Sequence, residues 1–244
     1  MTAGKGLDYR ERIIVALDVA TKEQALTLVD SFEQQVKFVK VGMELYYGLG
    51  PVIIEELKRR DLKIFLDLKL HDIPNTVGNA AAQLTKLGVE MFNLHVSGGL
   101  NMMVAARESM EKNLSNGQKW PLLIGVTQLT STDKKILNDE LGIPTTVEES
   151  VVHYARLAKT AGLAGVVSSV HEVELIKQYC GVEFLTVTPG IRLADGSADD
   201  QKRIATPERA IALGSDYLVI GRSITAAENP AEVFNQIINK LSVN

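Results

Sequence analysis

Charged residues of both signs stand near the ends of three short apolar segments in the N-terminal part of the chain. A lysine ammonium group beside a reacting atom can stabilise a developing negative charge and can donate a proton. A neighbouring aspartate keeps that lysine protonated, because an opposite charge favours the charged form. Buried alone, such groups are costly to desolvate, so mutual pairing is expected. The set predicts a functional site built from mutually paired charges, and its members are Asp18, Lys40, Asp67 and Lys69.

The alternation of side chains along the predicted strands determines which way these charges point. In the segment Ile64–Leu70 every second residue is an apolar Ile or Leu, which indicates a face covered by helices. The residues between them are expected to point into the interior of a barrel. By this count the inward faces hold Ile14, Ala16 and Asp18 on the first strand, Phe38, Lys40 and Gly42 on the second, and Phe65, Asp67 and Lys69 on the third.

Short β-branched segments alternate with amphipathic segments along the whole chain, which predicts an α/β fold, a single (β/α)8 TIM barrel. An open doubly wound sheet is the alternative. Such a sheet often has a Gly-rich turn after its first strand, whereas here Asp18 is followed by Val-Ala-Thr, so the barrel is favoured. The predicted strands are Arg12–Asp18, Phe38–Gly42, Lys63–Leu68, Met91–His95, Leu122–Thr127, Ala164–Ser168, Phe184–Val187 and Tyr217–Ile220. The predicted helices are Lys22–Phe32, Val52–Arg59, Val77–Leu87, Leu100–Asn113, Val147–Thr160, Val173–Tyr179, Pro207–Leu213 and Ala231–Leu241.

Long connections follow the predicted fifth and seventh strands, from Gln128 to Thr146 and from Thr188 to Thr206. Loops of this length in a compact domain tend to be lids or binding loops. Glycine and arginine occur close together after the seventh and eighth strands, where barrels often bind phosphate. Glycine lets backbone N–H groups approach the anion, and arginine adds permanently charged donors. A phosphate clamp is therefore predicted from Arg192, Gly221 and Arg222.

The composition argues against several classes of protein. With 244 residues, 45% hydrophobic and 23% charged, the chain fits one large globular domain, here divided into an N-terminal extension (1–11) and a catalytic barrel (12–244). The net charge of −4 argues against nucleic acid as a partner. The lone Cys180 has no disulfide partner, and no Cys/His cluster has metal-ligand spacing. Neither a signal peptide nor a membrane span is visible, so a cytoplasmic protein is expected.

The segment Phe65–Thr76, which reads Phe-Leu-Asp-Leu-Lys-Leu-His-Asp-Ile-Pro-Asn-Thr, strongly resembles the signature of the orotidine 5'-phosphate decarboxylase family. Its Asp-x-Lys-x-x-Asp part is shared with sugar-phosphate relatives, whereas the Ile-Pro-Asn-Thr that follows makes the match specific. Supporting matches occur in the family's order from Arg12 to the last helix. They lie at residues 16–18, 39–42, 93–95, 126–131, 187–192 and 219–223.

The resemblance implies decarboxylation of orotidine 5'-phosphate to uridine 5'-phosphate, the final step of de novo pyrimidine nucleotide biosynthesis, without metal or cofactor. It also implies a homodimer in which Asp72 and Thr76 reach the neighbouring subunit's site. Carried over by position, Lys69 is the proton donor, Asp67 lies beside the departing carboxylate, and Lys40 and Asp72 complete the charge array. The remaining implied contacts are Asp18 and Lys40 with the ribose hydroxyls, Thr130 with the pyrimidine, Thr76 with the neighbouring ribose, and Gln201, Arg192, Gly221 and Arg222 with the phosphate.

Two other interpretations stay open at this point. A metal-dependent sugar-phosphate decarboxylase or an aldolase-type barrel enzyme would need a divalent cation and would be expected to lack the loop at residues 127–130. A catalytically silent nucleotide-binding protein would be expected to lack an intact charged array. The histidines are spaced wrongly for a metal site, and His95 is expected, with Asn93, to be a satisfied polar residue in the barrel mouth.

Overall fold

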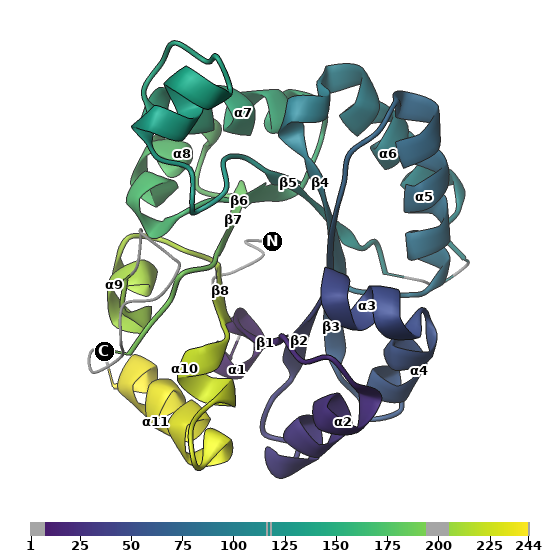
Figure 1. The fold of residues 1–244 in the computed structure, drawn as a ribbon, viewed down its shortest axis with the longest axis vertical. Coiled ribbons are helices and arrows are strands. Elements are labelled where there is room, and N and C mark those ends of the chain that lie inside the picture. The colour runs from purple at the N-terminus through teal and green to yellow at the C-terminus, as the bar shows by residue number, and fades with distance from the viewer. Residues whose placement is uncertain (1–7, 116, 118, 194–204, 244) are drawn as a thin grey trace.

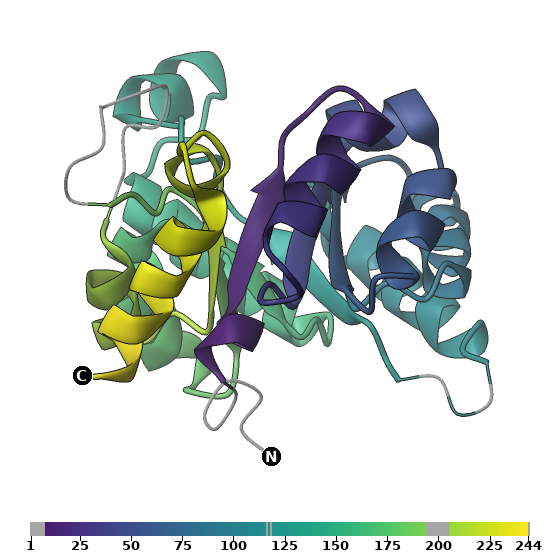
Figure 2. The same ribbon diagram turned by 90° about the horizontal axis from the view of Figure 1, so that it is seen from below.

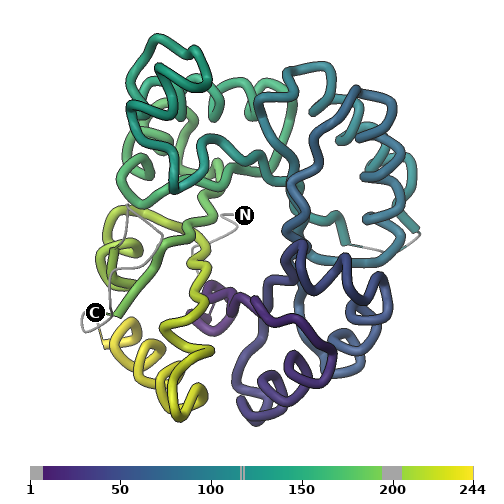
Figure 3. Tube along the Cα trace, in the orientation of Figure 1, coloured from purple at the N-terminus to yellow at the C-terminus, as the bar shows by residue number. Residues whose placement is uncertain are grey.

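The computed structural model describes residues 8–115, 117, 119–193 and 205–243. Eight parallel strands pair in chain order, and β8 returns to pair with β1, so the sheet is a closed barrel. Figure 3 shows the closure, with the purple β1 beside the yellow-green β8. The predicted (β/α)8 barrel is confirmed. The strands are β1 (Ile13–Leu17), β2 (Phe38–Gly42), β3 (Lys63–Leu70), β4 (Met91–His95), β5 (Leu122–Val126), β6 (Gly165–Val167), β7 (Leu185–Thr188) and β8 (Tyr217–Ile220).

Helices surround the strands as an outer layer, as the view down the barrel in Figure 1 shows. Eight of them correspond to predicted helices: α2 (Lys22–Ser31), α4 (Val52–Lys58), α5 (Pro74–Lys86), α6 (Leu100–Lys112), α7 (Val147–Thr160), α8 (Val173–Cys180), α9 (Pro207–Ala212) and α11 (Pro230–Ser242). Helix α5 begins three residues before the predicted start, because a proline is well tolerated in the first helical turn. The sequence did not predict α1 (Tyr9–Arg12), α3 (Met43–Leu49), α10 (Arg222–Thr225), the π-helical turn η2 (Ile136–Glu140) or the 3-10 turns η1 (Val96–Gly98) and η3 (Val170–Glu172).

The alternation of side chains separates two apolar layers, as the sequence predicts. The outward residues of the strands join the helices in one large core cluster, which contains Ile64 and Leu66. The inward residues form a second, smaller cluster that fills the barrel below its mouth. Phe65 belongs to this inner cluster, in agreement with the face assigned to it. The inner cluster consists of Ile14, Ala16, Phe38, Phe65, Met91, Ile124, Leu185, Val187, Tyr217 and Val219.

Strand β3 is irregular near its C-terminal end. Its register with β4 shifts between Leu66 and Leu70, because Leu66 pairs with Phe92 while Leu70 pairs with Leu94. Lys69 lies within this irregularity and has a φ of 52°, a left-handed conformation that is uncommon for a residue with a side chain. Bulges of this kind often re-aim side chains next to functional sites. The sequence predicted the inward direction of Lys69 but not this backbone conformation.

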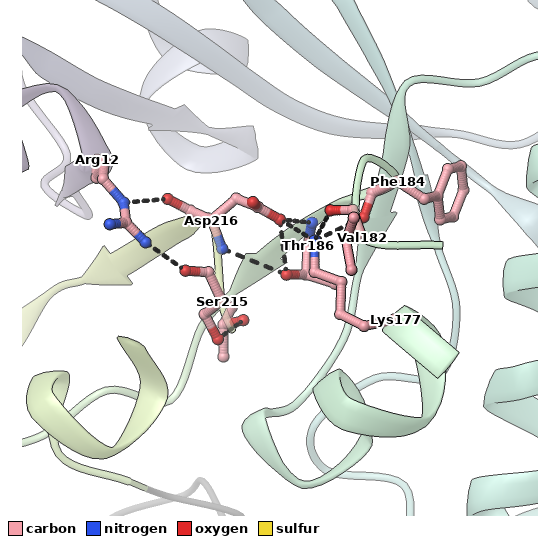
Figure 4. A network of polar contacts seen from close by, with 8 residues as sticks. Arg12, Lys177, Val182, Phe184, Thr186, Ser215 and Asp216 are labelled. Carbon is pink, nitrogen blue, oxygen red and sulfur yellow. Dashed lines mark hydrogen bonds and ion pairs between the residues drawn. The ribbon is translucent and has the colours of Figure 1, made fainter. Parts of the chain in front are cut away.

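The N-terminal ends of the strands are joined by a network of polar contacts (Figure 4). Arg12 donates to the backbone oxygens of Ser215 (2.7 Å) and Asp216 (3.0 Å). Lys177 Nζ lies 2.5 Å from the Asp216 carboxylate, and each side chain is only 13% exposed. The same carboxylate accepts from the Thr186 N–H at 2.8 Å. The network connects α8, β7 and β8 with the segment that leads into β1.

Residues 8–12 contact the barrel at the end where the strands begin. In the side view of Figure 2, the purple α1 lies at the lower edge and β1 runs upward from it. Tyr9 packs against the outer core, and Glu11 forms an ion pair with Lys63 at 2.9 Å. The division of the chain at residue 12 stays a prediction. None of the described helices combines the length and apolarity needed to cross a bilayer.

Candidate active site

A cavity of about 240 Å³ opens among the C-terminal ends of the strands and the loops that follow them. Its lower wall consists of apolar side chains of the barrel interior, including Phe65 and Val219. Barrel enzymes carry their active sites at this end of the fold. Eight of the predicted site residues line the cavity: Asp18, Lys40, Asp67, Lys69, Thr130, Arg192, Gly221 and Arg222.

Four of these side chains form a continuous row of alternating charge across β1, β2 and β3. Lys40 Nζ lies 2.9 Å from the Asp18 carboxylate and 3.5 Å from the Asp67 carboxylate. Lys69 Nζ lies 2.6 Å from Asp67 Oδ1. The strand ends thus bring together charges that lie far apart in the chain, the first and last of them, Asp18 and Lys69, by 51 positions. The predicted convergence of these residues is confirmed by the distances.

Asp67 is the most enclosed carboxylate of the row, with a side chain that is 14% exposed. Burial by itself raises the pKa of this carboxyl group, but the positive charges of Lys40 and Lys69 and the hydrogen bonds from Lys69 and Asn93 outweigh burial and lower the pKa below its usual value of 3.8. Asp67 is therefore ionised at neutral pH. A fixed negative charge between two ammonium groups orients both of them.

Two polar residues of β4 lie close to the charged row. Asn93 is 1% exposed, and its amide contacts both Asp67 and the backbone of Lys69. The His95 ring lies 5.4 Å from the His71 ring, measured between centroids. Burial, followed by the nearby His71 and Lys69, lowers the pKa of His95, so its neutral form is favoured. The sequence placed both residues in the barrel mouth, but it gave no sign that Asn93 contacts the charged row.

The loops after β7 and β8 also line the cavity, and the loop after β8 begins beside Asp18. Gly190 has a φ of 79°, which glycine adopts without steric cost. The Gly190 oxygen accepts from the Ala205 N–H, and the Ala205 oxygen accepts from the Arg192 N–H, so both ends of this connection are held together. After β8, Gly221 precedes α10, whose first residue is Arg222. Predicted residue Gln201 lies outside the described residues.

The loop after β5 supplies Gln128, Leu129 and Thr130 to the cavity. The start of this loop is held by β6, since Thr127 Oγ1 donates to the Val167 oxygen at 2.8 Å. The buried Gln128 amide donates to the Ser150 hydroxyl on α7 at 3.0 Å. Only Thr130 of these three was predicted as a site residue. Gln128 and Leu129 follow a predicted strand and carry no charge, so residue type alone did not single them out.

Asp72 and Thr76 do not line the cavity of their own barrel. Both side chains are exposed at the start of α5, where Asp72 Oδ1 accepts from the Ile73 N–H at 2.6 Å. Their predicted contribution to a neighbouring subunit's site stays a prediction, because it concerns a second copy of the chain. Among the described residues there is no group of three or more His, Cys, Asp or Glu side chains that could hold a metal ion.

The sequence profile of the orotidine 5'-phosphate decarboxylase / HUMPS family matches residues 11–237, which is most of the chain. The chain belongs to this family. Orotidine 5'-phosphate decarboxylases of the same family from Bacillus mycoides and Bacillus cytotoxicus are 52% and 53% identical to it, over 93% and 92% of this chain and 95% and 94% of theirs.

Two solved structures resemble the fold of this family member closely. The crystal structure of orotidine 5'-phosphate decarboxylase from Lactobacillus acidophilus has a TM-score of 0.84 at 38% identity, covering 94% of this chain and 98% of that one. An uncharacterized conserved protein from Geobacillus kaustophilus has a TM-score of 0.84 at 44% identity, covering 94% and 99%. The family resemblance noted from the motifs is thereby confirmed.

Proposed function

We propose that this protein converts orotidine 5'-phosphate to uridine 5'-phosphate and carbon dioxide, the last step of de novo pyrimidine nucleotide synthesis. The observation that carries the proposal is the row of Asp18, Lys40, Asp67 and Lys69 on the wall of a cavity at the C-terminal end of a family barrel. The row presents an ammonium group that is held in place by a neighbouring carboxylate. Such a group is what the loss of carbon dioxide from a ring carbon requires.

In this reaction the bond between the ring carbon and the carboxylate breaks, and its electron pair stays on the ring carbon. Lys69 Nζ, held 2.6 Å from Asp67, stabilises that negative charge and then transfers its proton to the carbon. Asp67 keeps Lys69 charged before the transfer and lies beside the carboxylate that leaves. The lysine regains a proton from solvent, so the cycle needs no oxidant, reductant or cofactor.

The phosphate side of the cavity supplies binding energy away from the reacting carbon. Arg192, Gly221 and Arg222 line the cavity on the loops after β7 and β8, where arginine donors suit a phosphate dianion. Thr130, Asp18 and Lys40 also line the cavity, and in this proposal Thr130 contacts the pyrimidine while Asp18 and Lys40 contact the ribose hydroxyls. Holding the phosphate fixes the ring against Lys69, and binding energy of this kind can lower the barrier of a distant step.

The alternative is a metal-dependent sugar-phosphate enzyme with the same barrel. In such an enzyme carboxylates at the strand ends would hold a cation. Here Lys40 and Lys69 already surround Asp67 at ion-pair distance, so positive charge is supplied by side chains. This arrangement favours the decarboxylase over the metal-dependent reaction.

A spectroscopic assay tests the proposal. Purified protein treated with a chelator and then mixed with orotidine 5'-phosphate should lower the near-ultraviolet absorbance of the substrate at an undiminished rate, with uridine 5'-phosphate as product. A ribulose or hexulose phosphate added in its place should remain unchanged. Activity that disappears with the chelator and returns with a divalent cation would support the alternative instead.

We also propose that the enzyme acts as a homodimer in the cytoplasm, with Asp72 and Thr76 of each subunit completing the partner's site. Their exposure beside α5, outside their own cavity, supports this arrangement. A mixture of inactive Lys69→Ala and Asp72→Ala proteins, after exchange of subunits, should recover activity. Random pairing makes half of the dimers mixed with one intact site each, so about a quarter of wild-type activity is expected. No recovery in exchanged dimers would contradict the shared site, and cell fractionation tests the location.

A further inference from the structure

We propose that Asn93 is a positioning residue for the decarboxylation, one that holds both the Asp67 carboxylate and the backbone of Lys69. The inference rests on the proposed function and extends it to a residue of β4 outside the charged row. Asn93 is neutral and almost completely buried, with 1% of its surface exposed. Burying an amide is unfavourable unless its donor and acceptor atoms form hydrogen bonds.

The two ends of the Asn93 amide contact two different parts of the proposed catalytic pair. Asn93 Nδ2 donates to Asp67 Oδ1 at 2.7 Å. Asn93 Oδ1 accepts from the backbone N–H of Lys69 at 2.8 Å. Since Lys69 Nζ also donates to Asp67 Oδ1, at 2.6 Å, the three residues close a ring of hydrogen bonds. The ring fixes the carboxylate oxygen and the lysine to one another and to β4.

The position of this ring coincides with the irregularity of β3. The regular register with β4 is lost between Leu66 and Leu70, and Lys69 there adopts a left-handed φ of 52°. Such a backbone conformation is costly for a residue other than glycine and persists only where its surroundings hold it. The Asn93 side chain is the acceptor for the Lys69 N–H at this point. It therefore stabilises the conformation that aims the lysine into the cavity.

A neutral amide is suited to this place for an electrostatic reason. The carboxylate of Asp67 faces Lys40 on β2 and Lys69 on β3, and His95 on β4 lies nearby, while Asp18 neutralises Lys40 from the far side. A second carboxylate beside Asp67 would have to share a proton with it, because two adjacent carboxyl groups resist double ionisation. An amide gives one donor and one acceptor without changing the net charge of the row.

Two substitutions separate the parts of this role. Asn93→Leu removes both hydrogen bonds at similar volume, and we expect kcat to fall about 10- to 100-fold, the cost of misplacing a reacting group by about 1 Å. The KM for orotidine 5'-phosphate should stay within about threefold of wild type, because the substitution leaves the residues of the phosphate clamp unchanged. Asn93→Asp keeps the acceptor for the Lys69 N–H but places a carboxylate against Asp67.

The pH profile of Asn93→Asp provides the decisive signature. When the new carboxyl group is protonated it can still donate to Asp67, so activity should be retained at acidic pH. As pH rises and the shared proton is lost, two negative charges face each other and kcat should fall, whereas we expect no such fall for the wild type, which has no second carboxyl group at this place. A merely structural role for Asn93 would lower activity only where the folded fraction, followed by circular dichroism, also declines, whereas a positioning role lowers kcat while the protein stays folded.

A matched control and a second readout complete the experiment. Thr186→Val removes a buried hydroxyl that contacts Asp216 at the other end of the barrel, and it should lower stability while leaving kcat and its pH profile unchanged. The rate at which an amine-reactive reagent modifies Lys69, measured by mass spectrometry, should rise several-fold in Asn93→Leu. The rate of modification of Lys177 should stay constant.

These measurements separate the two proposals. If Lys69 is modified more slowly in the wild type than in Asn93→Leu, but the wild type does not decarboxylate orotidine 5'-phosphate, the proposed function is contradicted and the positioning role is still supported. The positioning role would be overturned if the variants at Asn93 keep kcat within about twofold of wild type, with a wild-type pH profile and an unchanged rate of Lys69 modification.

Discussion

The network at the N-terminal end of the barrel allows one effect on stability to be worked out from its contacts. In Asp216→Ala, Lys177 loses an ion-pair partner at 2.5 Å, and the Thr186 N–H loses its acceptor at 2.8 Å. Removing one partner of a buried ion pair typically costs about 3–5 kcal/mol, because the remaining charge is left uncompensated. Lys177 Nζ keeps the backbone oxygens of Phe184 (2.8 Å) and Val182 (3.1 Å), as Figure 4 shows. These acceptors place the expected loss near the lower limit, at about 3 kcal/mol.

For a domain of this size, a loss of about 3 kcal/mol corresponds to a decrease in Tm of about 6–12 °C. Chemical unfolding followed by circular dichroism gives the free energy, and calorimetry gives the Tm. Turnover at 20 °C should be unchanged, because the network lies at the end of the barrel away from the cavity.

The paired variant Lys177→Met/Asp216→Leu provides the control. It removes both charges, so the loss of stability should be smaller than for Asp216→Ala alone. If Asp216→Ala lowers the free energy of unfolding by less than about 1 kcal/mol, or if the double variant is the less stable of the two, the uncompensated charge is not the cause.

Three further predictions concern the charged row and the phosphate wall. Lys69→Ala should bind uridine 5'-phosphate within about threefold of wild type by calorimetry while kcat falls at least about 10³-fold, and near-normal turnover would rule out Lys69 as proton donor. Arg222→Ala should lower kcat/KM about 10- to 150-fold through lost charged hydrogen bonds, with the affinity for unphosphorylated uridine as an unaffected control; unchanged constants would remove this arginine from the clamp. The pKa of Asp67 is lowered in the folded protein, so the unfolded chain binds the proton more readily. The ionised carboxylate therefore contributes stability that is fully present above the usual pKa of 3.8 and is lost as pH falls through the folded pKa. The difference in free energy of unfolding between wild type and Asp67→Asn should change mainly in that acidic range, and a main change centred near neutral pH would contradict the assignment.

The periodicity of the sequence determined the architecture and the direction of the site residues. Apolar residues at every second position along β3 placed Asp67 and Lys69 inside the barrel, and the structure has them there. Helix α7 was predicted from its apolar spacing with the limits that the structure has, and there Thr146 forms a capping box with Glu149 at its start. These features depend on neighbours within a few residues, so local patterns reveal them.

Contacts between distant segments were decided by the tertiary structure. The sequence does not reveal that Asn93 reaches Asp67, 26 positions earlier, or that Lys177 pairs with Asp216, 39 positions later. Where the backbone of Lys69 is left-handed, its N–H likewise donates to a residue of another strand, Asn93 of β4. A period of two residues specifies which face a side chain occupies. The partner that it meets on that face depends on how the closed barrel sets the register of its strands, and that register is a property of the assembled sheet.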